Sequence, residues 1–165
     1  MKKMPTSDVF AATARLLGQA PDDPDLRMFL ESLGKWPLPA FGPEELSIYV
    51  EDKTRGFSLE FRDSSSLKHP IAAGKPPQTP VFESAFFYAE GVDGYHAYAG
   101  MLPHGITWAD TATSIMSKMG SPKHEIKNKK TGLLTSHRWP EGQWMLGARY
   151  GGGGTSIKHL HIGIF

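Results

Sequence analysis

Apolar side chains recur with helical spacing at two places in the chain, and a glycine follows each stripe. The first stripe consists of Leu26, Phe29, Leu30 and Leu33, with Gly34 next. The second consists of Ala112, Ile115, Met116 and Met119, with Gly120 next. Residues at i, i+3, i+4 and i+7 share one side of a helix, and glycine readily adopts the left-handed conformation that ends one. The pattern predicts two amphipathic helices that end near residues 33 and 119.

Capping residues predict where the helices begin. Asp23 precedes Pro24, whose missing N–H costs nothing at the first helical position, so one helix is expected to start there. Thr107 or Asp110 is expected to start the helix that ends near residue 119. A further helix is predicted over about residues 8–17.

Elsewhere apolar and polar residues alternate, which is typical of strands with one buried face. Such runs cover residues 46–51, 57–62, 133–139, 144–150 and 157–164. Residues 81–89 are apolar on both faces and predict a central strand covered on both sides, and a short strand is expected over 95–99. The stretch 63–80 and the basic stretch 123–132 are expected to be loops.

Each helical stripe is followed by three strand-like runs, which suggests an internal repeat. We expect one domain over 1–165 with pseudo-repeats over 8–99 and 100–165, although a helix followed by a meander is common enough to arise twice without duplication. The fold class expected is α+β, a mostly antiparallel sheet of about six to seven strands with about three helices. The predicted core consists of Leu26, Phe29, Leu30, Leu33, Leu46, Ile48, Phe57, Leu59, Phe61, Phe86, Ile115, Met116, Met119, Leu146, Leu160 and Ile162.

The composition fits a folded domain with little excess charge. Apolar residues make up 39% and aromatic residues 11% of the 165 positions, and the formal net charge is +1. A nearly neutral chain argues against a protein that mainly neutralises nucleic-acid phosphates. Cysteine is absent, which excludes disulfides, thiolate metal sites and cysteine nucleophiles.

Nothing near the N-terminus predicts export or membrane insertion. Lys2 and Lys3 are followed by no apolar run, so no signal peptide is expected. No stretch approaches the roughly 20 apolar residues of a membrane span. We therefore expect a cytoplasmic protein with no membrane partner.

His159 and His161 are the strongest candidates for metal binding. Residues at i and i+2 on a strand point the same way, as two ligands of a zinc or iron site must. The spacing selects no third ligand, and a closed zinc site without cysteine needs four histidine or carboxylate ligands. Exposed strand histidines are the favoured interpretation and no cofactor is expected. A small metal-dependent enzyme that uses this pair stays open as an alternative.

No other motif is an enzyme signature. The glycines at 151–154 lie between two strands, whereas phosphate-binding loops join a strand to a helix. Lysines at 123, 127, 129 and 130 surround His124, but no aromatic residue is interleaved as in single-strand nucleic-acid binders. We expect no catalytic activity and no nucleic-acid partner. A small-molecule or nucleic-acid binding module stays open as a second alternative.

Two stretches resemble known families. Residues 16–24, Leu-Leu-Gly-Gln-Ala-Pro-Asp-Asp-Pro, with Phe-Leu-Glu-Ser-Leu-Gly at 29–34, resemble immunity proteins of bacterial polymorphic toxin systems. Residues 102–106, then 119–122 and the hairpin with tryptophans, are similar to one repeat of the small-lipoprotein and β-lactamase-inhibitor-like folds. The lack of cysteine does not support a lipoprotein role in the envelope. The resemblance implies an inhibitory protein that neutralises a cognate toxin or effector domain, and it transfers no catalytic residue.

Charge is distributed unevenly, which indicates where such a toxin would bind. Acidic residues outnumber basic ones over residues 22–63, and lysines in the second half compensate. A surface of one sign steers a partner of the other, although ordinary solvated charge is the alternative interpretation. The expected toxin contacts are Glu44, Glu45, Tyr49, Glu51 and Asp52, with Tyr95 and Trp108 as aromatic anchors.

Overall fold

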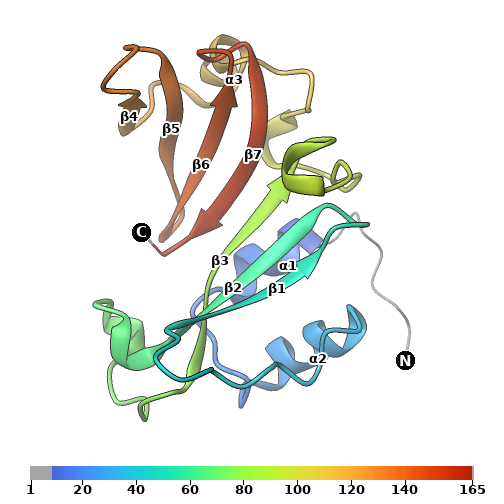
Figure 1. Ribbon diagram of the computed structural model, residues 1–165, viewed down its shortest axis with the longest axis vertical. Coiled ribbons are helices and arrows are strands. Elements are labelled where there is room, and N and C mark those ends of the chain that lie inside the picture. Colours follow the sequence, from blue (N-terminus) through green and yellow to red (C-terminus); the bar gives the residue numbers. More distant parts are fainter. Residues whose placement is uncertain (1–8, 165) are drawn as a thin grey trace.

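The computed structural model describes residues 9–164, which form one sheet of seven strands and three α-helices (Figure 1). The strand order is β1-β2-β3-β7-β6-β5-β4, and all neighbouring strands are antiparallel. The predicted α+β class is confirmed. Within these residues, no helix has the length and apolar character that crossing a bilayer requires.

The helices are α1 (Val9–Leu16), α2 (Pro24–Ser32) and α3 (Ala112–Met119). Asp23 caps α2 as predicted, because its carboxylate accepts the N–H groups of the second and third helical residues. The predicted start of the first helix at residue 8 lies outside the described residues.

Helix α3 begins later than the sequence predicts. Thr111 is the N-cap, and its side chain and that of Ser114 each accept a hydrogen bond from the other residue's N–H. Asp110, a predicted start, lies just outside the helix, where it accepts the Thr107 N–H at 2.7 Å and pairs with Lys118 at 2.7 Å. Asp110 therefore stabilises the connection that leads into α3.

The strands follow the predicted alternation except at two places. Their bounds are β1 (Ser47–Asp52), β2 (Phe57–Asp63), β3 (Pro80–Tyr88), β4 (His124–Lys127), β5 (Leu134–Glu141), β6 (Trp144–Gly151) and β7 (Ser156–Gly163). Strand β4 forms where a loop was expected, because its four exposed side chains show no apolar alternation in the sequence. The strand expected over 95–99 does not form.

The sheet joins two meanders through their last strands. Strands β1, β2 and β3 are neighbours in sequence order, and so are β5, β6 and β7. Strands β3 and β7 pair from Ser84 opposite Gly163 to Tyr88 opposite His159, and β4 adds an outer edge strand to the second meander. Two copies of a helix-and-meander unit related by a two-fold axis would produce this arrangement. An origin by duplication stays a prediction.

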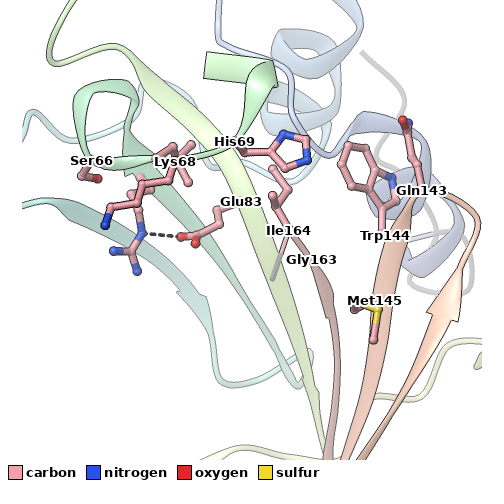
Figure 2. Close-up of a pocket in the computed structure, with 11 residues that line it drawn as sticks. Ser66, Lys68, His69, Glu83, Gln143, Trp144, Met145, Gly163 and Ile164 are labelled. Carbon is pink, nitrogen blue, oxygen red and sulfur yellow. Dashed lines mark hydrogen bonds and ion pairs between the residues drawn. The ribbon is translucent and has the colours of Figure 1, made fainter. Parts of the chain in front are cut away.

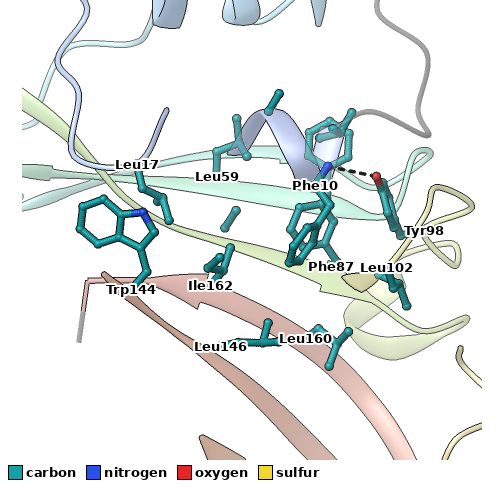
Figure 3. Close-up of a cluster of buried hydrophobic side chains, with 14 of the residues drawn as sticks. Phe10, Leu17, Leu59, Phe87, Tyr98, Leu102, Trp144, Leu146, Leu160 and Ile162 are labelled. Atoms are coloured by element: carbon teal, nitrogen blue, oxygen red, sulfur yellow. Dashed lines mark hydrogen bonds between the residues drawn. The ribbon is translucent and has the colours of Figure 1, made fainter. Parts of the chain in front are cut away.

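One apolar cluster lies on the face of the sheet where the helices pack, here called the covered face (Figure 3). Phe10 of α1 meets Leu59 of β2 and Phe87 of β3, and Leu146 and Ile162 extend the cluster across the second meander. Buried residues of α2 and α3 belong to the same cluster. The opposite side of the sheet, here called the open face, contributes polar side chains and is described below.

Most of the predicted core is buried, with four exceptions, one of which is the half-buried Met119 at the end of α3. Leu46 precedes β1 and is 51% exposed, and Met116 lies at the margin of the α3 stripe and is 36% exposed. Phe86 is half-buried on the open face, because it alternates with the buried Ala85 and Phe87. The predicted central strand is confirmed, but its apolar covering on both faces does not extend to Phe86.

The long connection between β2 and β3 is organised by a buried carboxylate. Asp63 accepts hydrogen bonds from the N–H and hydroxyl of Ser65 and from the N–H of Gln78, each at 2.9 Å. Burial would raise the pKa of Asp63, but these bonds outweigh it and hold the pKa below its ordinary value. The connection predicted as a loop is thus anchored at both of its ends.

Candidate functional site: the open face of the sheet

Side chains on the open face form continuous rows across the strands. In strand order, one row consists of Glu51, Ser58, Phe86, His161, Gly147, Arg138 and His124. A neighbouring row runs from Tyr49 through Glu60 to Ser84, and another from His159 through Arg149 to Ser136. Every second residue of these strands points into the core, so the rows consist of the alternate residues, which point away from it.

A groove of about 490 Å³ opens on this face over the central strands. Its lining residues, which define the open-face groove, are Glu60, Arg62, Glu83, Ser84, Phe86, Ile126, Ser136, Arg138, Arg149, His159 and His161. The carboxylates belong to β2 and β3, and two of the three arginines belong to β5 and β6. The groove therefore has an acidic end and a basic end.

Aromatic and imidazole rings form the middle of the open-face groove. The Phe86 ring centroid lies 5.4 Å from that of His159 and 5.6 Å from that of His161, and the two imidazoles are 5.4 Å apart. Tyr88 continues the set at 5.7 Å from His159 and stacks on Tyr95 at 3.8 Å. Such rings offer flat contact surface with little loss of side-chain entropy on binding.

Gly147 makes room for one of these rings. A Cβ atom at position 147 would overlap the imidazole of His161. Any other residue would displace the ring from its place over β6, so the glycine is explained by a close approach. His161 is consequently buried, with 8% of its surface exposed.

Both histidines are neutral at neutral pH. Burial lowers the pKa of His159 to about 4, and the nearby charge of Arg149 acts in the same direction. Burial lowers the pKa of His161 to about 3, helped by His159 and Arg138. Each neutral ring can donate one hydrogen bond and accept another.

The two arginines of the basic end stand on neighbouring strands and on the same face. Arg138 lies opposite Gly147, and Arg149 lies two residues further along β6. Arg149 is exposed and forms no hydrogen bond or ion pair within residues 9–164, whereas Arg138 is half-buried. Diagonal neighbours of this kind are within reach of long side chains, so two positive charges lie close together here.

The acidic end is satisfied by internal partners. Glu60, which is 6% exposed, accepts hydrogen bonds from Ser47 at 3.0 Å, Tyr49 at 3.1 Å and Ser84 at 3.0 Å. Arg62 pairs with Glu60 at 3.3 Å and with Glu83 at 2.6 Å. Burial raises the pKa of Glu83 in spite of the Arg62 partner.

A second hollow lies on the other side of the Arg62–Glu83 pair (Figure 2). It has a volume of about 460 Å³ and is called the end pocket, because it lies where β6 begins and β7 ends. Figure 2 shows Lys68 near the ion pair and His69 facing the ring of Trp144, whose centroid is 6.3 Å away. The ion pair thus separates the end pocket from the open-face groove.

The histidine pair does not assemble a metal site in the described part of the chain. His159 and His161 lie on one face as the sequence predicts, but they are largely buried rather than exposed. Residues 9–164 contain no group of three histidine or carboxylate side chains placed to hold a metal ion. The geometry provides two of the ligands and no third.

Three of the predicted toxin contacts come together on the open face. Tyr49 is 59% exposed, and Glu51 is exposed two residues further along β1. The Tyr95 hydroxyl donates to Glu51 at 2.8 Å, although the tyrosine itself is 3% exposed. Burial and the Glu51 hydrogen bond raise the pKa of Tyr95, so the phenol stays protonated. Tyr95 therefore positions Glu51 and offers little surface of its own.

The other predicted contacts lie apart from this group. Asp52 points to the covered face, where it pairs with Arg55 at 2.7 Å and Lys35 at 3.5 Å. Glu44 and Glu45 lie in the exposed turn before β1, and Glu45 accepts the Gly42 N–H at 2.9 Å. Trp108 is half-buried and donates its ring N–H to a backbone carbonyl of residue 98 at 2.8 Å.

From the sequence, Glu60 is counted only among the acidic residues of the first half, and Arg138 and Arg149 are not singled out. Glu60, Arg138 and Arg149 belong to different strands, and only the register brings them to one face. Alternation along β2, β5 and β6 is the signal that could have placed them on the polar side. The order of the strands, on which the grouping depends, is not encoded in that alternation.

Comparisons with known proteins do not show a family for this chain. No family model matches it, and no curated protein matches it in sequence. Among solved structures it is similar to a DUF4309 family protein (YjgB) from Bacillus subtilis subsp. subtilis str. 168, with a TM-score of 0.43 and 11% identity over 84% of this chain and 77% of that chain. A likeness at this level carries no functional argument.

Proposed function

We propose that the protein is a non-catalytic immunity protein that binds a cognate bacterial toxin or effector domain in the cytoplasm and blocks it. The observation that carries the proposal is the open face: a row that includes charged, aromatic and imidazole side chains crosses the seven strands, while the helices pack on the opposite side. An antiparallel sheet often keeps one face for its core and presents the other to its surroundings.

The residue types of this face are those that dominate protein interfaces. Tyrosine, phenylalanine and arginine are enriched at interface centres, and Tyr49, Phe86 and Arg149 provide them here. The acidic and basic ends would steer and orient a partner with the complementary charge pattern. The sequence resemblance to immunity proteins supports the choice of a toxin as that partner.

Co-expression with the product of the neighbouring gene tests the proposal. We expect the two proteins to co-elute and the toxicity of the neighbour to be suppressed. A Tyr49→Ala, Arg149→Gln double variant should lose both effects, whereas Met28→Ala, at a 59% exposed position on α2, should keep them. A neighbouring gene product that neither co-elutes nor is neutralised would refute the immunity function. Loss of binding only in the Met28 variant would refute the assignment of the open face as the binding surface.

A further inference from the structure

The two outer strands of the sheet differ in what lies beside them. The strand order places β1 at one edge and β4 at the other, and each pairs with one neighbour among the described residues. On β1, the backbone carbonyl of Glu51 accepts a hydrogen bond from the Lys35 ammonium at 2.9 Å. Strand β4 pairs with β5 from His124 to Lys127 and lies at the outer margin of the second meander (Figure 1). An edge strand of this kind presents backbone N–H and C=O groups on its outer side.

The chain around β4 is exposed and strongly basic. Every residue from 123 to 133 is exposed, and this stretch is here called the basic edge segment. Its charged residues are Lys123, Glu125, Lys127, Lys129 and Lys130. Glu125 is already engaged by Lys127 at 3.1 Å and by His137 at 3.0 Å. Lys123, Lys129 and Lys130 form no ion pair with any residue of 9–164, so the segment has positive charge that the fold does not compensate.

Two apolar side chains accompany the lysines. Ile126 is 40% exposed and Leu133 is 54% exposed. Ile126 also lines the open-face groove, so a strand added beside β4 would extend the open face. Edge lysines oppose pairing with another basic strand, which includes the same segment of a second copy. They do not oppose an acidic strand.

We infer that β4 accepts an extended acidic segment of a partner protein as an additional strand of the sheet, with carboxylates at the lysines and an apolar side chain on Ile126. The edge determines the conformation of the occupant, because another strand can pair with its row of N–H and C=O groups. The lysines determine the charge of the occupant, because opposite charges on neighbouring strands attract. A nucleic acid or an anionic lipid offers the charge without the matching backbone. The inference stands whether or not the partner is a toxin.

The test is a titration of the intact protein with a short, end-capped peptide of alternating glutamate and valine, followed by backbone amide NMR. Physiological ionic strength is used, because it screens charges more than about 8 Å apart. We expect saturable shifts and slower amide hydrogen exchange over residues 124–127, and neither effect over residues 47–52 of β1. The same peptide with lysine in place of glutamate should not bind.

A third peptide separates backbone pairing from charge attraction. It keeps the glutamate and valine side chains but has methyl groups on the backbone nitrogens of two consecutive central residues. Methylation removes N–H donors from both edges of the peptide and leaves its charge unchanged. We expect its affinity to be about tenfold lower, as the loss of backbone hydrogen bonds predicts.

Matched variants locate the charge that matters. Lys123→Gln with Lys130→Gln should weaken binding of the acidic peptide about fivefold, because each removed ion pair is worth a modest amount. Lys68→Gln with Lys158→Gln removes the same charge from exposed positions outside the basic edge segment and should change the affinity less than twofold. Equal effects of the two double variants would mean general attraction and would refute the site.

Three further results would overturn the inference. The first is failure of the acidic peptide to bind, or a response at β1 in place of β4. The second is equal affinity for the methylated peptide, or for an oligothymidylate of the same charge, because neither pairs as a strand. The third is concentration-dependent protection of the β4 amides without any peptide, which would show that a second copy covers this edge. Co-elution with a toxin would remain a separate result in each case.

Discussion

The two faces of the sheet are made by alternate residues of the same strands, yet they are stabilised in different ways. On β2, Leu59 is fully buried among apolar side chains, and the next residue, Glu60, is almost as buried but surrounded by hydroxyl groups and an arginine. On β7, Leu160 and His161 repeat the contrast. Burial on the covered face follows from packing, whereas burial on the open face depends on specific polar partners.

The open face itself shows the same contrast on a smaller scale. Its acidic end satisfies its own hydrogen bonds and ion pairs, so it acts as a rigid part of the fold. At its basic end, Arg149 is exposed beside neutral imidazoles and forms no ion pair with any residue of 9–164. Arg149 at the basic end is therefore an exposed charge that the proposed partner could reach without displacing an internal ion pair.

The largest expected effect is on the covered face. Leu59→Ala should lower the free energy of unfolding by about 2–5 kcal/mol, because it leaves a cavity in the apolar cluster. Urea unfolding followed by circular dichroism measures the loss. Leu133→Ala, at a 54% exposed position, should stay within about 0.5 kcal/mol of the wild type. Equal losses in the two variants would contradict the assignment of the core.

A second effect depends on pH and belongs to the open face. His159 and His161 have pKa values of about 4 and about 3 in the folded chain, whereas the unfolded chain has ordinary values near 6.5. Between pH 6.5 and 4 the unfolded state binds more protons, so these histidines make the protein less stable as the pH falls. Above pH 6.5 they contribute no pH dependence.

Comparison with a double variant isolates this contribution. Between pH 6.5 and 4.5 the free energy of unfolding should fall less in the His159→Gln, His161→Gln double variant than in the wild type. The difference should exceed about 1 kcal/mol, because one unit of pKa corresponds to about 1.4 kcal/mol. Carboxylates titrate in both proteins and largely cancel in the difference. Parallel stability curves for the two proteins would mean that the imidazoles are not held neutral by the fold.

The hydrogen-bond network of the acidic end should produce a smaller loss. Glu60→Gln keeps the shape of the side chain but removes the charge that Arg62 and three hydroxyl groups surround, so we expect a loss of about 1–3 kcal/mol. Ser84→Ala should cost about 1 kcal/mol. In the double variant the two losses should be less than additive, because both remove the same hydrogen bond. Strict additivity would separate Ser84 from the network.

The smallest effect on stability is expected at the basic end. Arg149→Gln removes an exposed side chain without an ion pair in the described chain, so the free energy of unfolding should change by no more than about 0.5 kcal/mol. Thermal unfolding in the absence of ligand measures it. A loss of more than 1 kcal/mol would assign Arg149 a structural role and remove the contrast between the two ends.

The sequence predicts the elements of this fold better than the functional surface. Asp23 and Pro24 mark the start of α2, and alternation marks the strands, because capping and burial leave local patterns. Strand β4 escapes prediction since it buries no side chain and is held by pairing with β5. The sequence predicts Phe86 in the core because an apolar run does not show which face of the sheet each of its residues occupies.

The candidate site depends on contacts that alternation does not reveal. The sequence singled out His159 and His161 and placed them correctly on one face, but it did not show that Gly147 lets a ring approach β6 or that Arg149 lies beside them. It also grouped Glu51 with Asp52, whose side chains lie on opposite faces. Register and strand order decide all of these relations, and they are set by the whole sheet.

The most direct test of the central claim, that the open face is the binding surface, is hydroxyl-radical footprinting with and without the proposed toxin partner, once it is identified by co-elution. Tyr49 and Ile126 are 59% and 40% exposed on the open face, and Met28 and Met116 are 59% and 36% exposed on the helices. We predict that complex formation protects Tyr49 and Ile126 and leaves the two methionines labelled as in the free protein. Protection of Met28 and Met116 with unchanged labelling of Tyr49 and Ile126 would contradict the account.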